Sequence, residues 1–258
     1  MGRYVRRELG RYGVDTSFVR TIAGEMRTSL AVVETRIENC QSVIYRNGAA
    51  DFALQADHLK DIAFGDYAAL IVTGTALAVE PSRSGARLAM LRARQAGVGV
   101  ILDVDYRPYS WASAAEAARV CHDAARASDI VVGNDVEFDV MAGGAGGLDL
   151  ARWLATDRHA VIYKMGEKGS TSFSEGRSFD TPIDSVEALK PTGAGDAFMA
   201  GLVTGLASGL GLAAAVRQTG DRCFVAHGAG EAGDIVDRML LVFVDADAAT
   251  ADCRSQAG

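Results

Sequence analysis

AALIVTGTALAVEPSRSGARLAMLRARQAGVGVILDVD, residues 68–105, decides the fold class of this chain. Its two ends, 68–74 and 98–105, are short, nearly continuous apolar runs, which is the composition of strands buried on both faces. The stretch between them has Pro81 where a helix would begin and Gly97 just past its end. A strand, a helix and a second strand in this order predict two parallel strands joined by a crossover helix.

The same alternation continues on both sides of this stretch. Further strand candidates are residues 42–46, 128–134 and 159–166. Ser113 and Glu116 have the spacing of a capping box ahead of the helix that connects the next two strands. Buried parallel strands need helices on both faces, so the sequence predicts an α/β fold of three layers, with helices on either side of a mostly parallel sheet.

Two segments depart from this pattern and predict antiparallel hairpins. Residues 28–34 lead through a polar stretch into the strand candidate 42–46. Residues 171–180 form alternating segments on either side of Glu175-Gly176, a dipeptide that suits a tight turn. We expect these hairpins to form a small flap and an extension of the sheet edge.

Composition limits the class of protein. The 258 residues include 26 Lys and Arg against 33 Asp and Glu, a net charge of −7, which argues against nucleic acid or an anionic membrane as the main partner. No long linker divides the chain, so we expect one domain over residues 1–258. The apolar runs are too short to cross a membrane and the four cysteines lack CxxC spacing, which predicts a cytoplasmic protein with reduced thiols.

PTGAGDAFMAGL, residues 191–202, is the motif with the clearest chemistry. The backbone N–H groups of Gly193, Ala194 and Gly195 lie at the start of a predicted helix, where N–H groups without a helical acceptor stabilise anions. Asp196 would repel a phosphate there unless it had a separate task, such as taking the proton of an attacking hydroxyl group. The alternative is structural: an Asp that complements the helix dipole, after glycines that only turn the chain.

Two other predicted strands end in residues that suit a phosphate site. In an open parallel sheet, ligands bind beyond the carboxyl ends of the strands. One strand ends in NDVE, with Asn134 and Glu137, and the next ends in KMGEKG, with Lys164, Gly166 and Gly169. Taken alone, NDVE also fits a helix cap and GEKG also fits a plain turn.

Together, PTGAGDAFMAG, NDVE and KMGEKG resemble the signatures of the ribokinase-like (PfkB) carbohydrate kinases, in the order that this family has them. The resemblance implies a three-layer α/β/α fold with a small β lid, and a kinase that uses ATP and Mg²⁺. It implies that Asp196 is the catalytic base and that residues 193–195 form the anion hole. It places at the ATP and magnesium sites Lys164, Gly166, Gly169 and Asn134, with Glu137 near the metal through water.

Within the family, the resemblance is most specific in the middle of the chain. VILDVDYRPYSW (100–111), SVIYRNGAAD (42–51) and SDIVVGNDVEFDVM (128–141) are similar to the 5-dehydro-2-deoxygluconokinases, in a span that runs from near residue 2 to about residue 210. This similarity implies phosphorylation of the primary hydroxyl of a keto sugar acid, 5-dehydro-2-deoxy-D-gluconate, to the 6-phosphate. The alternatives are the related acid 2-keto-3-deoxygluconate or the sugar substrate of another PfkB kinase.

A keto sugar acid needs a cation for its carboxylate and polar partners for its hydroxyl groups. Arg46 and Arg107 stand at predicted strand ends, and arginine binds a carboxylate through two parallel hydrogen bonds. Asp103 and Asp105 lie two apart on one predicted strand, so both should face the same side and order hydroxyl groups or an arginine. The alternative for Arg107 is a structural ion pair with one of these acids.

The chain departs from the family's pattern at both ends. Met1 aligns downstream of the family's first strand and sugar-binding segment, and residues 218–258 do not resemble the family. We therefore expect an open, apolar edge on the sheet. A second hypothesis follows, namely a fragment that folds in part and at most binds nucleotide. Family members often dimerise through lid strands, so a homodimer is one option for the oligomeric state.

Overall fold

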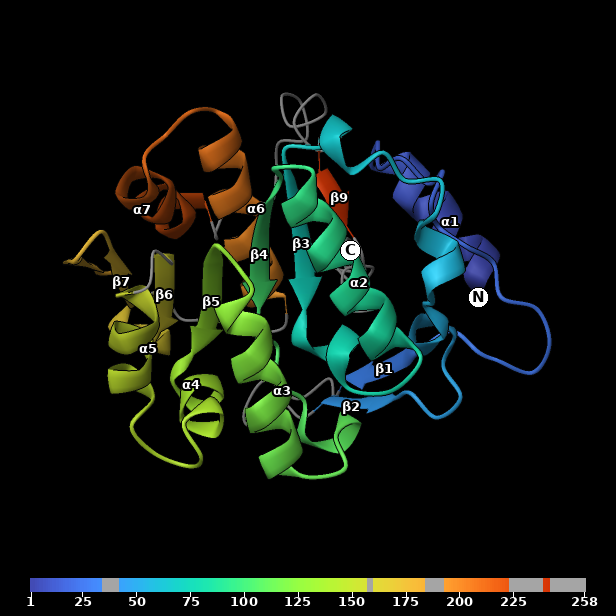
Figure 1. The fold of residues 1–258 in the computed structure, drawn as a ribbon, viewed down its shortest axis with the longest axis horizontal. Coiled ribbons are helices and arrows are strands. Elements are labelled where there is room, and N and C mark those ends of the chain that lie inside the picture. The colour runs from blue at the N-terminus through green and yellow to red at the C-terminus, as the bar shows by residue number, and fades with distance from the viewer. Residues whose placement is uncertain (34–41, 157–159, 184–192, 223–238, 242–258) are drawn as a thin grey trace, which may run out of the picture.

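The computed structural model describes residues 1–33, 42–156, 160–183, 193–222 and 239–241. Within them, a seven-stranded sheet with the order β8-β7-β6-β5-β4-β3-β9 forms the centre of the molecule (Figure 1). Its strands are β3 (Ala69–Thr73), β4 (Gly99–Asp103), β5 (Ile130–Asn134), β6 (Ala160–Lys164), β7 (Ser170–Ser174), β8 (Arg177–Thr181) and β9 (Met239–Leu241). The α-helices are α1 (Gly2–Arg11), α2 (Ser82–Gln95), α3 (Ala114–Arg126), α4 (Asp135–Met141), α5 (Gly147–Ala155), α6 (Ala194–Ala207) and α7 (Leu212–Arg222).

The middle of the sheet is parallel, as the sequence predicts. β3 pairs with β4 from Ala69↔Gly99 to Thr73↔Asp103, and β4–β5 and β5–β6 are parallel as well. Each of these four strands falls inside one predicted apolar run, and α2 begins directly after Pro81. The carboxyl ends of β3, β4, β5 and β6 therefore meet at one edge of the sheet.

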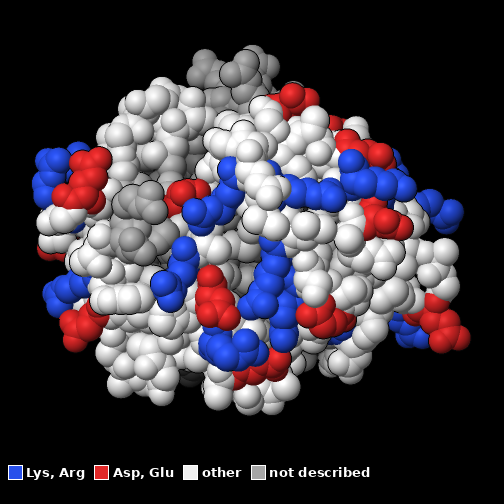
Figure 2. Space-filling view, viewed as in Figure 1, with Lys and Arg blue, Asp and Glu red and all other residues white. Residues whose placement is uncertain are grey.

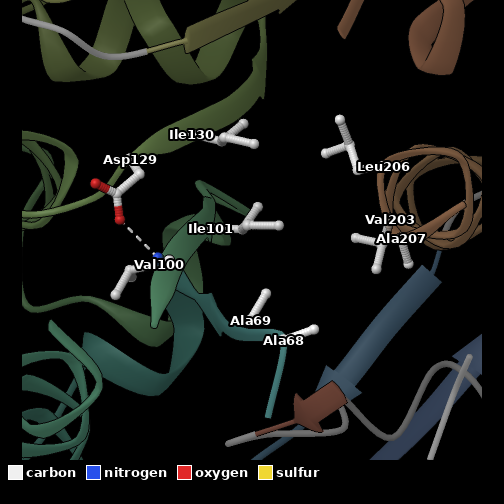
Figure 3. A pocket seen from close by; sticks show the side chains of 10 residues that line it. Ala68, Ala69, Val100, Ile101, Asp129, Ile130, Val203, Leu206 and Ala207 are labelled. Atoms are coloured by element: carbon white, nitrogen blue, oxygen red, sulfur yellow. Dashed lines mark hydrogen bonds between the residues drawn. The ribbon is translucent and has the colours of Figure 1, made fainter. Parts of the chain in front are cut away.

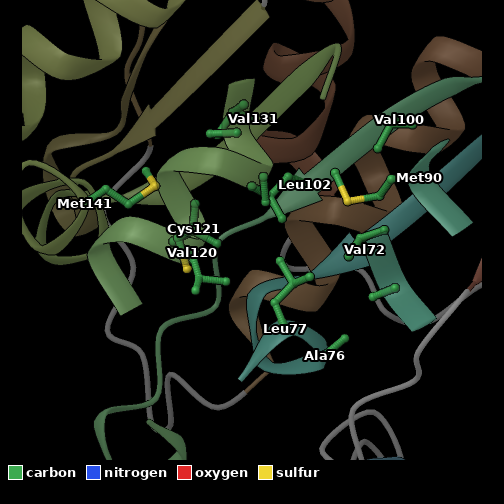
Figure 4. Close-up of a cluster of buried hydrophobic side chains, with 14 of the residues drawn as sticks. Val72, Ala76, Leu77, Met90, Val100, Leu102, Val120, Cys121, Val131 and Met141 are labelled. Atoms are coloured by element: carbon green, nitrogen blue, oxygen red, sulfur yellow. The ribbon is translucent and has the colours of Figure 1, made fainter. Parts of the chain in front are cut away.

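Helices cover both faces of this sheet. Side chains alternate along a strand, so β4 sends Leu102 to one face and Ile101 to the other. The first face packs against α2, α3, α4 and α5, and the second packs against α6 and α7 (Figure 1). Figure 4 shows the first core around Leu102, where Met90 of α2 and Val120 of α3 are also buried. The predicted three layers are confirmed.

Both predicted hairpins are present. β1 (Leu30–Val33) and β2 (Ser42–Tyr45) pair antiparallel and form a separate two-stranded sheet, the flap. β7 and β8 also pair antiparallel and extend the central sheet. At their turn, Glu175 (φ 53°) and Gly176 (φ 72°) both adopt the left-handed conformation that a two-residue hairpin loop requires.

At the edge of the sheet, β3 is paired with a further strand over three residues. Met239–Leu241 form β9, which pairs parallel with Ala69–Ile71. The expectation of an open edge is therefore wrong for this part of β3, because a segment of the tail pairs with it. Residues 242–258 of the tail lie outside the described residues.

The capping box predicted ahead of α3 is only half formed. The Ser113 hydroxyl accepts the Glu116 N–H (3.1 Å), but the Glu116 carboxylate pairs with Arg83 of α2 at 2.8 Å. Glu116 thus ties α3 to α2, because a guanidinium is a stronger partner for a carboxylate than a backbone N–H. Arg87 and Asp123 link the same two helices at 3.5 Å, and Figure 2 shows basic and acidic side chains side by side on this face.

Cys121 of α3 is a buried free thiol. Burial raises the pKa of Cys121 to about 12, so it stays a neutral packing group at physiological pH. The other cysteines, Cys40, Cys223 and Cys253, lie outside the described residues. In the part of the chain that the structure describes, no helix has both the length and the apolar composition that a membrane span needs.

Candidate active site

α6 begins inside the motif that the sequence singles out. Gly193 precedes the helix with φ +86°, a conformation that favours glycine. The first hydrogen bond within the helix runs from the Ala197 N–H to the Gly193 carbonyl (2.9 Å), so the N–H groups of residues 194–196 precede it and stand at the positive end of the helix dipole. Asp196 is exposed in this first turn. A place for an anion and a proton acceptor therefore lie within one helical turn.

Asp103, the last residue of β4, interacts with four other predicted site residues. Burial raises the pKa of its carboxyl group to about 7; the charge of Lys164 lowers that pKa, and the carboxylates of Asp105, Glu137 and Asp196 raise it. Such mutual effects require nearby charges. The structure thus brings the ends of β4 and β6 together with the first turns of α4 and α6, at the carboxyl edge of the sheet.

This raised pKa gives a testable dependence of stability on pH. The unfolded carboxyl group has a pKa of 3.8, so between pH 3.8 and 7 the folded chain keeps a proton that the unfolded chain has lost. Its contribution to stability is complete below pH 3.8 and disappears as pH rises through 7. Between pH 5 and pH 8, the wild type should therefore lose about 3 kcal/mol relative to Asp103→Asn, since about two pH units of this range lie between the two pKa values.

Urea unfolding of both proteins at several pH values measures this difference. Asp57→Asn, which removes an exposed carboxylate, is the control. Parallel profiles for the wild type and Asp103→Asn would show that Asp103 titrates like an exposed carboxylate.

Asp105 differs from its prediction. β4 ends at Asp103, and Asp105 lies beyond the strand with φ +32°, so the two carboxylates do not share one strand face. The Asp105 carboxylate accepts the Thr75 hydroxyl (3.1 Å) and pairs with Arg107 at 2.9 Å. These bonds hold a backbone conformation that is uncommon for residues other than glycine. The ion pair considered as the alternative for Arg107 is therefore present.

Asn134 and Glu137 form a complete capping box at the start of α4. The Glu137 N–H donates to Asn134 Oδ1 (2.9 Å), and the Asn134 N–H donates to Glu137 Oε2 (2.7 Å). Glu137 is buried, and its Oε1 accepts the Tyr106 N–H (3.2 Å) from the loop after β4. The helix-cap alternative is thus shown, and Glu137 also ties α4 to the loop that carries Asp105 and Arg107.

The described residues fit a magnesium ion only in an indirect way. Among them, no cluster of three or more His, Cys, Asp or Glu side chains could hold a metal ion. Mg²⁺ usually keeps several water ligands and is held by substrate phosphates plus one or two carboxylates. Glu137, whose two oxygens each accept one backbone N–H, still has lone pairs for such a water. These donors suit an ion that arrives with a nucleotide.

The end of β6 faces α6 and then turns. Lys164 Nζ lies 5.4 Å from the ring centroid of Phe198 on α6. The turn η6 (Gly166–Lys168) follows, and Gly169 closes it with φ +82°. A Cβ on Gly169 would lie 2.2 Å from the Thr181 carbonyl oxygen of β8, so only glycine fits there. Lys164 therefore lies beside the first turns of α6, with the GEKG turn beyond it.

Arg46 lies where the flap joins the body of the molecule. Its guanidinium pairs with Asp51 at 2.8 Å and lies over Phe52, 5.1 Å from the ring centroid. Arg46 and Arg107, both predicted to bind a substrate carboxylate, thus each have an Asp partner in their own segment. They come from separate elements, Arg46 from the end of β2 and Arg107 from the loop after β4.

Comparison with known proteins identifies the family of this chain. The family model of the pfkB family carbohydrate kinases matches residues 1–219. The chain belongs to this family. A 5-dehydro-2-deoxygluconokinase of Photobacterium profundum is 38% identical over 238 residues, which are 86% of this chain and 72% of that relative. Another, of Geobacillus thermodenitrificans, is 34% identical over 81% of this chain, and the match spans only 64% of that relative's length.

Solved structures show the same fold for this pfkB-family chain. The PfkB protein from Polaromonas sp. has a TM-score of 0.76 at 24% identity, over 88% of this chain and 75% of that one. A fructokinase from Vibrio cholerae, in a form with fructose, ADP and calcium bound, has a TM-score of 0.73 at 22% identity, over 92% and 78% of the two chains. These likenesses confirm the ribokinase-like three-layer α/β/α fold.

Two residues of this pfkB-family site are missed by the sequence motifs. Thr75 is 1% exposed and donates to Asp105, which lies 30 positions away in the sequence. The polar VTGT stretch at the end of β3 is the only sequence signal for Thr75. Phe198 lies inside the PTGAGDAFMAG motif, where its contact with Lys164 has no sequence signature.

The pfkB-family chain also has an apolar cavity away from this site. The cavity has a volume of about 230 Å³ and lies between the first residues of β3, β4 and β5 and the second half of α6 (Figure 3). Leu206 lines it, about 15 Å along the helix from Asp196. Its charged lining residue, Asp129, accepts the Val100 N–H (2.7 Å). Because the cavity lies at the amino ends of the strands and lacks converging polar groups, it is not the candidate active site.

Proposed function

We propose that this chain transfers the γ-phosphoryl group of ATP to the primary hydroxyl of a keto sugar acid. The proposed substrate is 5-dehydro-2-deoxy-D-gluconate and the product is its 6-phosphate, a choice supported by the names of the Photobacterium and Geobacillus relatives. The observation that carries the proposal is Asp196 in the first turn of α6, coupled electrostatically to Asp103. A general base beside an anion site suits phosphoryl transfer to a hydroxyl group.

In this mechanism, Asp196 accepts the proton of the attacking hydroxyl group. Gly193, Ala194 and Gly195 form the anion hole, in which backbone N–H groups and the helix dipole stabilise the charge on the transferring group. The exposed position of Asp196 leaves its carboxylate accessible to a substrate. Because Asp196 takes the proton while the backbone N–H groups bind the phosphoryl group, a carboxylate at an anion site is consistent with this mechanism.

The nucleotide is proposed to lie across the GEKG turn and the start of α6. Gly166 and Gly169 supply a turn of backbone without side chains, and Lys164 adds a positive charge next to α6. Asn134 completes the site at the cap of α4. When bound, a magnesium ion neutralises phosphate charge, and Glu137 holds it through water.

The sugar acid is proposed to bind where the flap and the loop after β4 supply cations. Arg46 and Arg107 hold the carboxylate, while Asp103 and Asp105 order hydroxyl groups. The ion pair between Asp105 and Arg107 does not exclude this role, because it engages Arg107 Nη2 and fixes the guanidinium in one place. Binding of the acid would then add a further partner to an oriented cation.

Replacing Arg107 with alanine is expected to raise the KM for the keto sugar acid by about 10- to 100-fold, because a charge-assisted hydrogen bond contributes about 1.5–3 kcal/mol. The KM for ATP should change much less. Arg177→Ala is the control, since Arg177 pairs with Glu175 at 3.2 Å on the exposed β7–β8 turn. Steady-state kinetics measure both variants, and an unchanged KM in Arg107→Ala would remove this residue from the substrate site.

An ATP-consumption assay over a panel of sugars tests the function itself. The panel contains 5-dehydro-2-deoxygluconate, 2-keto-3-deoxygluconate, fructose and ribose, and the product is identified by mass and by phosphorus NMR. The proposal expects the first compound to be the best substrate. A clear preference for 2-keto-3-deoxygluconate would keep the kinase and change the substrate, whereas phosphorylation of neutral sugars alone would contradict the roles given to Arg46 and Arg107.

The proposal includes a homodimer through the flap. Leu30 lies opposite Tyr45 and Val32 lies opposite Val43, so these four side chains share one face of the two-stranded sheet. They are between 47% and 59% exposed. A contiguous exposed apolar face favours a protein contact, and the same face of a second copy would cover it.

A further inference from the structure

A buried polar cluster joins the flap to the body of the molecule. Asp51 Oδ1 accepts the Ser29 hydroxyl (2.6 Å), and Asp51 Oδ2 pairs with Arg46 Nη2 (2.8 Å). Ser29 is 6% exposed and Arg46 is 9% exposed. One carboxylate thus connects two residues that are largely withdrawn from water, where charge-assisted bonds are strong.

The two partners of Asp51 stand at the same end of the flap. Ser29 directly precedes β1, and Arg46 directly follows β2. Asp51 itself belongs to the short helix η1 (Ala50–Ala53) in the body of the molecule. Its two oxygens therefore hold the first strand at its beginning and the second strand at its end.

Backbone bonds reinforce this junction. The Arg27 N–H donates to the Gly48 carbonyl (3.1 Å), and the Ala50 N–H donates to the Arg27 carbonyl (2.8 Å). These bonds fix the two chain segments that enter and leave the flap next to each other. They do not involve the Arg46 side chain, whose guanidinium is oriented by contacts such as those with Asp51 and the ring of Phe52.

The junction is anchored at the edge of the sheet that carries the candidate active site. Leu54, just after η1, packs closely against Gly85 of α2. A Cβ atom added to Gly85 would lie only 2.9 Å from the Leu54 carbonyl oxygen. α2 begins after η4 (Gly74–Leu77), which follows the carboxyl end of β3 and contains Thr75, the partner of Asp105. Asp51 thus lies on a segment that is packed against the site's own framework.

We propose that Asp51 is a positioning residue, which fixes the Arg46 guanidinium and couples the flap to the active site. The proposal rests on the proposed function in one respect, namely that Arg46 binds the substrate carboxylate. Without the Asp51 carboxylate, Arg46 loses this ion pair, and the single acceptor oxygen of an asparagine cannot serve both Arg46 and Ser29. The flap and the cation would then move independently, and the acid would meet a less well oriented guanidinium.

Kinetics of Asp51→Asn, with the substrate that the panel identifies, test the role in binding. The variant is expected to raise the KM for the sugar acid by about tenfold or more, with kcat within about threefold and the KM for ATP unchanged. Asp51→Glu, which keeps the charge, should recover part of the loss. Asp61→Asn is the matched control, because Asp61 also pairs with an arginine, Arg20 at 3.7 Å, but on the surface. A KM for the acid that is unchanged or lower would overturn the proposal.

Hydrogen exchange tests the coupling of the flap without any assay of activity. Amides of β1 and β2 should exchange faster in Asp51→Asn and in Ser29→Ala, whereas amides of β4 and β5 should be unaffected. If the wild type phosphorylates nothing in the panel, the proposed function fails, and this experiment still judges Asp51. Flap amides that exchange at the wild-type rate in both variants would overturn the coupling. If Asp51→Asn does not fold, Asp51→Glu replaces it in the kinetic test, with a smaller expected rise in the KM for the acid, and Ser29→Ala carries the hydrogen-exchange test.

Discussion

Asp196→Asn is expected to lower kcat by about a thousandfold and to leave the fold intact. The amide has nearly the same shape as the carboxylate, but it cannot accept the proton of the attacking hydroxyl group, and general base catalysis typically contributes about a hundred- to ten-thousandfold. The N–H groups of residues 194–196 remain in place, so the KM for ATP should change little. Steady-state kinetics and a single-turnover measurement with the preferred sugar acid check both statements.

The fold should survive because Asp196 contributes little to packing. It is exposed, whereas α6 is held to the sheet by the buried residues Met199, Leu202 and Val203. Loss of a carboxylate near the positive end of a helix costs about 0.3–1 kcal/mol. Circular dichroism and thermal unfolding should therefore differ little between the variant and the wild type.

The chain offers a matched control at the start of α5. Asp149 is the third residue of α5, just as Asp196 is the third residue of α6. Both helices also follow a glycine with a positive φ, which is 85° for Gly146 and 86° for Gly193. Asp149 is 84% exposed in an ion pair with Arg152, and α5 packs on the other face of the sheet. Asp149→Asn should cost at least as much helix stability, since it also loses this exposed ion pair, and leave kcat unchanged. Equal activity of the two variants would refute the catalytic role of Asp196.

Features of the fold that depend on local patterns could be predicted from the sequence. Buried strands such as 130–134 can be recognised in the sequence as apolar runs, and the dipeptide Glu175-Gly176 predicts the β7–β8 turn. The position of β9 could not be predicted, because three apolar residues in the tail carry no information about their partner strand. The Glu116 side chain likewise pairs with an arginine on α2 that only the packing of two helices brings near.

In the candidate site, too, local motifs could be predicted from the sequence and tertiary contacts could not. Asp196 and the GEKG turn belong to short motifs, and the topology of a parallel sheet brings strand ends together, as the electrostatic neighbours of Asp103 show. The turn of the chain at Asp105, with φ +32°, could not be predicted, because it depends on a hydroxyl 30 residues earlier, that of Thr75. The link from Ser29 to Asp51 spans 22 residues in the same way. Sequence motifs thus indicate the candidate site residues, and tertiary contacts decide how these residues are held.

Gly74→Ala is expected to be the most destabilising of the substitutions considered. Gly74 is buried at the start of η4, and a Cβ there would lie 2.0 Å from the carbonyl oxygen of Val104. The contact involves backbone, so no side chain can rotate away, and either β3 or the segment after β4 must move. Overpacking of a buried site typically costs about 1–3 kcal/mol, and a clash with fixed backbone belongs at or above the upper end of that range.

The same substitution should distort the candidate active site, because Val104 lies between Asp103 and Asp105 and its N–H donates to the Val132 carbonyl (2.9 Å). We therefore expect Gly74→Ala to lose about 3 kcal/mol or more of unfolding free energy in urea and to lose activity even below its unfolding transition. Gly65→Ala is the control: Gly65 is exposed, a Cβ on it would meet no atom within 4 Å, and the substitution should change stability by less than about 0.5 kcal/mol. A Gly74 variant as stable as the Gly65 variant would mean that β3 and the loop after β4 are not in the close contact on which the geometry of Asp103, Asp105 and Thr75 depends.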